Sequence, residues 1–145
     1  MPIHLSGTAR ITLRIASSAA AANLSVYLVQ LPWPTESVDI SNLITRGWAD
    51  PQNYRSLTKG GSYQSMEKGT PLRLGEFVTL TFDLEPDDQV IPAGKKIALM
   101  ILSSDREFTL WPKPGTELSV DLDATKIALP VVGGPGAFRR AMNGG

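Results

Sequence analysis

The chain has 145 residues, which suits one domain with a hydrophobic core of its own. Its 14 Lys and Arg residues balance its 14 Asp and Glu residues, so the composition gives no electrostatic basis for binding nucleic acid or an anionic membrane. The lack of cysteine excludes disulfides and thiolate sites, and a single histidine argues against structural zinc. We therefore expect no cofactor, no metal, no nucleic acid and no membrane partner, and leave cytoplasmic and secreted locations open.

Strands are predicted along the first part of the chain. Residues 8–15 alternate apolar side chains with Thr and Arg, which is typical of a strand with one face on a core and one in water. Residues 24–29 are apolar on both sides, which predicts a central strand covered on both faces. A weaker strand is predicted at residues 43–48.

Residues 49–75 interrupt this pattern, because they carry several glycines and no sustained periodicity. A connection of this length inside a domain is usually functional or packs on something outside the domain, and a mobile surface loop is the alternative. Four side chains in and just before it are interface or cleft candidates, because aromatic and Arg residues are enriched at protein interfaces. They are Arg46, Trp48, Tyr54 and Arg55.

Strand patterns return in the second half of the chain. Residues 76–84 alternate, residues 85–94 are predicted as a short connection between turns, and residues 97–102 form a second run that is apolar on both faces. Further strands are predicted at residues 108–111, 116–122 and 126–129.

About eight short strands separated by turns predict an all-β fold, a sandwich of the jelly-roll kind, with a closed barrel as the alternative. We expect the sandwich to occupy residues 1–136 and a tail to occupy residues 137–145.

The sequence provides no complete set of catalytic residues. Nucleophilic hydrolysis needs a base beside a nucleophile and a third group that orients the base. The only histidine, His4, is expected to face solvent on a short terminal strand. Residues 60–64 approach the Gly-x-Ser-x-Gly elbow around Ser62, but Gln64 stands where the second glycine is required. We expect no catalytic residue in this chain.

The residue types leave two other kinds of binding site to consider. Asp83, Glu85, Asp87 and Asp88 could supply oxygen ligands to calcium, but their spacing is not that of an EF-hand and such residues are common in turns. Three tryptophans, Trp33, Trp48 and Trp111, leave a carbohydrate-binding module open as an alternative function. Burial at one end of the sandwich or at a domain interface accounts for them more simply.

The order of the segments resembles the C-terminal domain of Xaa-Pro dipeptidyl-peptidases and of the related cocaine esterase-type acyl hydrolases. The resemblance covers roughly residues 5–134 and includes the run Ile44-Thr45-Arg46-Gly47-Trp48. The other segments that carry it are residues 6–8, 23–29, 75–86, 91–97, 103–110 and 129–134.

The resemblance implies a galactose-binding-like jelly roll that follows an α/β-hydrolase domain, whose Ser-Asp-His triad lies upstream of this region. The sandwich would then brace that domain, its partner in the same parent chain, and shape the cleft for a proline-containing peptide or an acyl substrate. Relatives often carry Gly-His-Arg where this chain has Gly94-Lys95-Lys96, and Leu-Arg where it has Ala49-Asp50. Peptidase and ester or amide hydrolase therefore both remain open for the parent.

Overall fold

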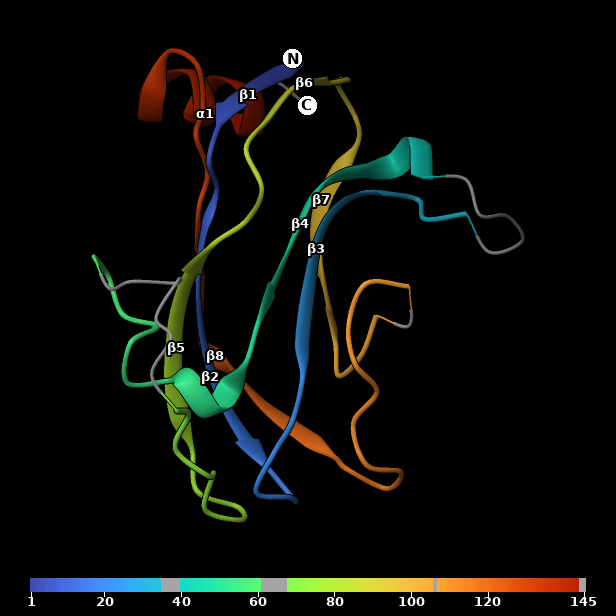
Figure 1. The fold of residues 1–145 in the computed structure, drawn as a ribbon. Helices are drawn as coiled ribbons and strands as arrows, with labels where there is room; N and C mark the ends of the chain where they lie inside the picture. The colour runs from blue at the N-terminus through green and yellow to red at the C-terminus, as the bar shows by residue number, and fades with distance from the viewer. Residues whose placement is uncertain (35–39, 61–67, 106, 144–145) are drawn as a thin grey trace.

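Two antiparallel three-stranded sheets face each other in the computed structural model, which describes residues 1–34, 40–60, 68–105 and 107–143 (Figure 1). One sheet has the order β5-β2-β8, and its strands are β2 (Arg10–Ser17), β5 (Val78–Asp83) and β8 (Leu118–Ala128). The other has the order β4-β3-β7, and its strands are β3 (Leu24–Leu31), β4 (Leu43–Ala49) and β7 (Lys96–Leu102). A short ribbon pairs β1 (Ile3–Gly7) with β6 (Asp87–Ile91). The predicted all-β sandwich is confirmed. Because each described sheet has two free edges, the barrel alternative is wrong.

The core lies between the two sheets and follows the alternation of the strands. On β2 and β5 the inward-facing side chains of Ile11, Leu13, Leu80 and Phe82 are almost completely buried. On β3 the inward positions are Leu24, Val26 and Leu28. Burial of each such side chain contributes roughly 1.5–3 kcal/mol, so this layer dominates the stability of the domain.

The second run predicted as a central strand is an edge strand instead. Among the described residues β7 pairs with β3 alone, and every residue from Ile97 to Leu102 is half-exposed. The first run, now β3, is central and buried as predicted. Composition alone does not separate the two cases, because an apolar edge looks like an apolar centre when the neighbouring surface is unknown.

Three further predictions about elements were wrong. Residues 108–111 form no strand, because the backbone turns where the amides of Phe108 and Thr109 donate to the carbonyl of Asp105. Residues 85–94 contain a strand, β6, rather than a simple connection. The two strands predicted at 116–122 and 126–129 are one strand, β8, with an irregularity where its register against β2 shifts between Thr12 and Arg14.

A helix, α1 (Gly134–Asn143), follows the sandwich and lies at the same end of the molecule as the N-terminus (Figure 1). It falls largely where a tail was expected. Pro135 near its start suits a first helical turn, and Phe138, Ala141 and Met142 share one face through their spacing. No helix in the described ranges is long and apolar enough to cross a membrane.

Candidate functional surface

Arg46 and Trp48 lie on the outer face of β4, because the inward positions between and beside them contact the core. Their partners on β3 are Tyr27 and Ser25, respectively. Gly47 points inward, where a Cβ atom would lie 2.8 Å from Cδ2 of Leu84 and 3.0 Å from its Cα. Strand β4 can therefore approach this segment closely only because residue 47 has no side chain.

The loop that follows β7 contributes Phe108 to the same surface. The guanidinium carbon of Arg46 lies 4.1 Å from the centre of the Phe108 ring and 5.2 Å from that of Trp48. The two aromatic rings are 5.7 Å apart, centre to centre. A cation between two aromatic faces is held by electrostatic attraction and by packing. We refer to Tyr27, Arg46, Trp48, Asp105 and Phe108 as the Arg46 cluster.

A buried carboxyl group, that of Asp105, accepts hydrogen bonds from this cluster. The Tyr27 hydroxyl and the Trp48 Nε1–H, the latter at 3.3 Å, both donate to its Oδ2. Burial and the hydrogen bond to Asp105 raise the pKa of Tyr27 to about 12, and the nearby Arg46 guanidinium acts in the opposite direction. Tyr27 therefore keeps its proton throughout the physiological range and acts as a fixed donor.

Tyr54 and Arg55 follow a short 3₁₀ helix, η2 (Pro51–Asn53), which Asp50 caps by accepting a 2.8 Å hydrogen bond from the Gln52 amide. The Tyr54 ring packs against the core, and the exposed Arg55 guanidinium lies 5.7 Å from its centre. Tyr54 therefore anchors the turn that presents Arg55.

Two neighbouring hollows are lined by two of the four candidate residues, Trp48 and Arg55. Trp48 lines a hollow of about 290 Å³, and Arg55 lines a polar one of about 330 Å³. Asn53 and Ser56 line both hollows. Trp48 and Arg55 therefore border adjoining hollows, while Arg46 contacts the Trp48 ring and Tyr54 lies beneath the Arg55 guanidinium. The role of these four residues in an interface or a cleft wall remains a prediction.

Sequence reasoning did not single out Tyr27, Asp105 and Phe108 as members of this surface. Tyr27 lies in an apolar run, and Phe108 belongs to the residues wrongly predicted as a strand. The available signal was Tyr27 itself, because a phenol in an otherwise apolar run usually has a hydrogen-bond partner.

The only histidine, His4, is not part of the Arg46 cluster and lies on the β1–β6 ribbon. His4 Nε2 is 2.7 Å from Asp88 Oδ1, and the Ser6 hydroxyl donates to Asp88 Oδ2 at 2.8 Å. These hydrogen bonds, that of His4 first, hold the pKa of the Asp88 carboxyl below its usual range. The three residue types match a serine hydrolase triad, but the order of contacts does not. A triad needs the imidazole between the hydroxyl and the carboxylate, whereas here the carboxylate lies between the other two.

The acidic residues near β5 and β6 do not gather around a common point. Asp83 Oδ1 accepts a 2.6 Å hydrogen bond from Arg10 Nε, and Asp88 faces His4 and Ser6. In the part of the chain that the structure describes, no three His, Asp or Glu side chains are placed to hold a metal ion. Ser62 lies outside the described residues.

The tryptophans do not form one sugar-stacking platform. Trp48 is half-buried and its ring contacts Arg46 and Phe108. The exposed Trp111 lines a different hollow, formed with Leu110 and Leu74, from the one that Trp48 lines. Half-buried Trp33 lies beyond the end of β3.

Comparisons with known proteins bear on the same questions. Residues 1–140 match the protein family described as the X-Pro dipeptidyl-peptidase C-terminal non-catalytic domain. A Rhodopirellula baltica protein named as a Xaa-Pro dipeptidyl-peptidase is 54% identical over 134 residues, which cover 91% of this chain and 20% of that protein. The chain thus spans about a fifth of the length of the curated relatives it matches.

Two solved structures share the fold at low sequence identity. An α-amino acid ester hydrolase matches with a TM-score of 0.63 and 17% identity, over 90% of this chain and 24% of the other. A CocE/NonD family hydrolase from Staphylococcus aureus matches with a TM-score of 0.64 and 14% identity, over 90% of this chain and 29% of the other.

Proposed function

The chain belongs to the X-Pro dipeptidyl-peptidase C-terminal non-catalytic domain family, and from this premise we propose that it is the sandwich domain of a larger serine hydrolase that releases Xaa-Pro dipeptides. In that enzyme the sandwich, residues 1–136, braces an α/β-hydrolase domain and contributes one wall of its substrate cleft. Proline-containing peptides are the substrate class, and catalysis belongs to the hydrolase domain.

One observation carries this proposal: the chain matches relatives over nine-tenths of its own length but only a fifth of theirs. The contacts of His4 support it, because Asp88 rather than a hydroxyl group is its partner. The surface around the Arg46 cluster supports the second part of the proposal. It combines aromatic rings, two cations and adjoining hollows, which suits the wall of a substrate cleft.

The test uses a chimera in which this chain replaces the C-terminal fifth of the Rhodopirellula baltica relative. We expect the chimera to hydrolyse a chromogenic Xaa-Pro dipeptide substrate and the separate 145-residue chain to show no turnover. Turnover by the separate chain that is lost in His4→Ala or Ser62→Ala would contradict the proposal. An inactive chimera whose two parts separate after cleavage at an engineered junction would contradict it as well.

The cleft role is tested by Arg55→Ala in the same chimera, because Arg55 is exposed and its loss should leave the fold intact. If this surface walls the cleft, KM rises while kcat changes less, since binding that is uniform between ground and transition states is lost. Arg73→Ala is the control, because Arg73 is also an exposed arginine and its Nη1 lies 3.4 Å from Oε2 of the neighbouring Glu76. Equal KM values for the two variants would remove Arg55 from the cleft.

A further inference from the structure

One flank of the sandwich is apolar and only half covered. The edge strands β7 and β8 border it, and within the described residues neither has a strand partner on its outer side. Side chains from both strands pack against the core yet stay partly exposed, among them Ile97, Leu99, Val120 and Ile127. We refer to this side, together with α1, as the β7–β8 flank.

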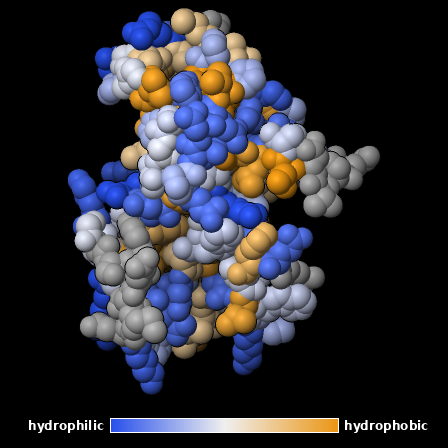
Figure 2. Space-filling model, turned by 45° about the horizontal axis from the view of Figure 1, so that its top comes forward, coloured by the Kyte–Doolittle hydropathy of each residue, from blue (hydrophilic) through white to orange (hydrophobic). Residues whose placement is uncertain are grey.

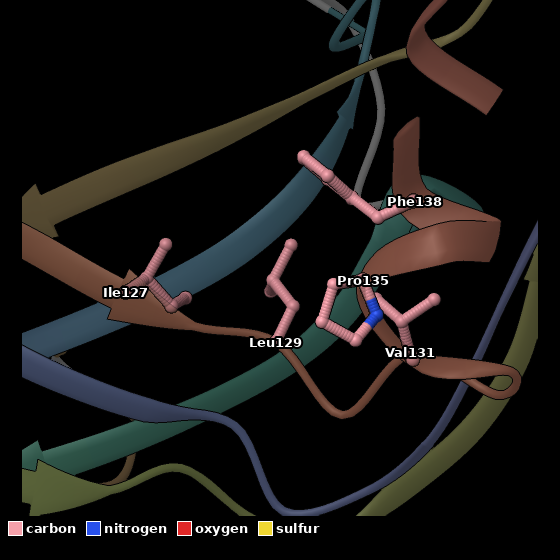
Figure 3. Close-up of a pocket in the computed structure, with 6 residues that line it drawn as sticks. Ile127, Leu129, Val131, Pro135 and Phe138 are labelled. Atoms are coloured by element: carbon pink, nitrogen blue, oxygen red, sulfur yellow. The ribbon is translucent and has the colours of Figure 1, made fainter. Parts of the chain in front are cut away.

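Helix α1 forms the rim of the flank and turns its apolar face toward it. Figure 3 shows Ile127 and Leu129 projecting on the same side as Pro135 and Phe138 of α1. A larger hollow of about 530 Å³ adjoins these residues and extends to Ile97 on β7 and to Met142. Hydrophobic surface is visible at this end of the molecule in Figure 2. Met142 is 67% exposed although it lies beside this hollow, so the apolar surface continues beyond the cavity.

The charges at the rim all have one sign. Lys95 and Lys96 line the large hollow and are exposed, and no Asp or Glu is among the described residues that line it. An occupant that complements this surface is apolar at its centre and carries a carboxylate at its edge, since like charges would repel and an unpaired cation would lose hydration.

The chain terminus gives the occupant an identity. Met1 itself lines the large hollow. In the Rhodopirellula baltica relative, the remaining polypeptide is about four times as long as the matching region. Because the family is a C-terminal domain, this remaining polypeptide precedes the matching region. A preceding chain joined at Met1 would therefore enter beside this flank.

We propose that the preceding part of the full-length hydrolase docks on the β7–β8 flank, with apolar side chains over Ile97, Ile127 and Phe138 and an acidic side chain opposite Lys95 and Lys96. This inference rests on the proposed function, because it requires the catalytic part to be present. It assigns the docking contact to a surface other than the one that carries the interface candidates named from the sequence, which are Arg46, Trp48, Tyr54 and Arg55.

The chain has no cysteine, so single thiols can report coverage without a background. Met142→Cys places a thiol on the flank, and Thr79→Cys places one at an exposed position on β5, away from it. Each is reacted with a maleimide in the 145-residue chain and in the Rhodopirellula baltica chimera, with the cysteines native to the relative replaced. We expect the thiol of Met142→Cys to react with the maleimide at least about tenfold more slowly in the chimera than in the separate chain, because a covered thiol reacts only when the interface opens. Thr79→Cys should react alike in both.

The charge of the occupant is tested by Lys95→Glu with Lys96→Glu in the chimera that carries Met142→Cys. Loss of protection is expected, and Lys113→Glu, an exposed lysine elsewhere, should not cause it. Protection that survives the double reversal would overturn the acidic complement.

The outcomes separate the two proposals. An active chimera in which Met142→Cys reacts as fast as in the separate chain overturns the docking site and leaves the proposed function intact. An inactive chimera with both thiols unprotected contradicts the proposed function itself. Protection in the separate chain that grows with its concentration would show that a second copy covers the flank, which also overturns the inference.

Discussion

At the scale of single residues, the Arg46 cluster depends on one glycine and one phenol. Gly47 lets β4 approach Leu84, which fixes the positions of Arg46 and Trp48 on either side of it. Tyr27 satisfies the buried carboxyl group of Asp105. Both residues thus determine where the other members of the cluster lie.

Gly47→Ala is expected to destabilise the domain, because the new methyl group would lie 2.8 Å from Leu84 Cδ2 and 3.0 Å from its Cα. Overpacking of this kind costs roughly 1–3 kcal/mol. Urea unfolding measures the loss in free energy. Gly136→Ala is the matched control, since its Cβ would meet only the end of the Arg140 side chain, at 3.4 Å, in the first turn of α1. An unchanged unfolding midpoint for Gly47→Ala would contradict the close approach.

Tyr27→Phe is expected to lower stability by about 1–3 kcal/mol, because a buried acceptor on Asp105 loses a donor. It should also change the alkaline side of the pH profile. Tyr27 has its pKa raised from 10.0 to about 12 in the folded chain, so the folded state holds its proton more tightly than the unfolded state. The stabilisation is complete below pH 10 and is lost as the pH rises toward 12.

The variant should therefore lose less stability than the parent sequence between these two pH values, as measured by urea unfolding in that range. In a pH titration followed by the absorbance of tyrosinate, the variant should also lack the phenol that ionises at the highest pH, which is Tyr27. Tyr54→Phe serves as the control, because it removes another phenol from the same surface. A profile for Tyr27→Phe that matches the parent would contradict the role assigned to its proton.

At the scale of elements, an ion pair links β2 to β8 beside their register shift. Arg14 Nη1 donates to Asp121 Oδ2 at 2.6 Å, and the Arg14 guanidinium carbon also lies 4.5 Å from the centre of the Phe77 ring. The amide of Ala124 donates to the other carboxylate oxygen at 3.2 Å, where β8 is irregular. The Asp121 side chain thus joins the two strands at the point where their backbone pairing is interrupted.

The acid side of the stability profile should reflect this pair. The hydrogen bond from Arg14, followed by that from Ala124, holds the pKa of the Asp121 carboxyl below its usual 3.8. The unfolded state then binds its proton first as the pH falls, so the contribution is present above pH 3.8 and disappears as the pH drops through the folded value. Asp121→Asn should flatten this decline in unfolding measurements between pH 5 and the acid limit of folding, whereas Asp123→Asn, a neighbouring exposed carboxyl, should not. A decline of equal steepness in Asp121→Asn would contradict the assignment.

The elements that sequence predicted correctly are those whose pattern follows from the core. Residues 8–15 and 76–84 alternate because one face of β2 and of β5 is buried, and that periodicity is local information. The edge position of β7 could not be predicted in this way, since it depends on which strand is absent beside it. Strand β6 was missed because Ile91, at its end, is the only buried residue among the five of this strand. For the candidate surface, Arg46 and Trp48 were accessible to sequence reasoning, but Asp105 was not, because its partners come from distant strands.

At the scale of the whole molecule, the sandwich is closed on one flank and open on the other. The segment around Leu84 lies against both sheets, with its amide bonded to Ala9 and that of Glu85 bonded to Arg46. On the β7–β8 flank no comparable bridge joins the sheets within the described residues, and α1 covers only one end. The two proposals therefore concern different sides of the domain: an apolar flank for docking, and a polar, aromatic surface for the cleft.

The open edge of β7 also bears on how such a protein is made. Residues 97–102 have no charge and no proline, and Lys96 is the only charged residue of the strand. A free, apolar strand edge is a template for pairing with other chains, and such edges cause aggregation when they are not protected. In a C-terminal domain this strand leaves the ribosome after the polypeptide that we propose to cover it. Because domains tend to fold as units in the order of synthesis, the covering surface would already exist when β7 forms, and the hazardous edge would be hidden almost as soon as it appears.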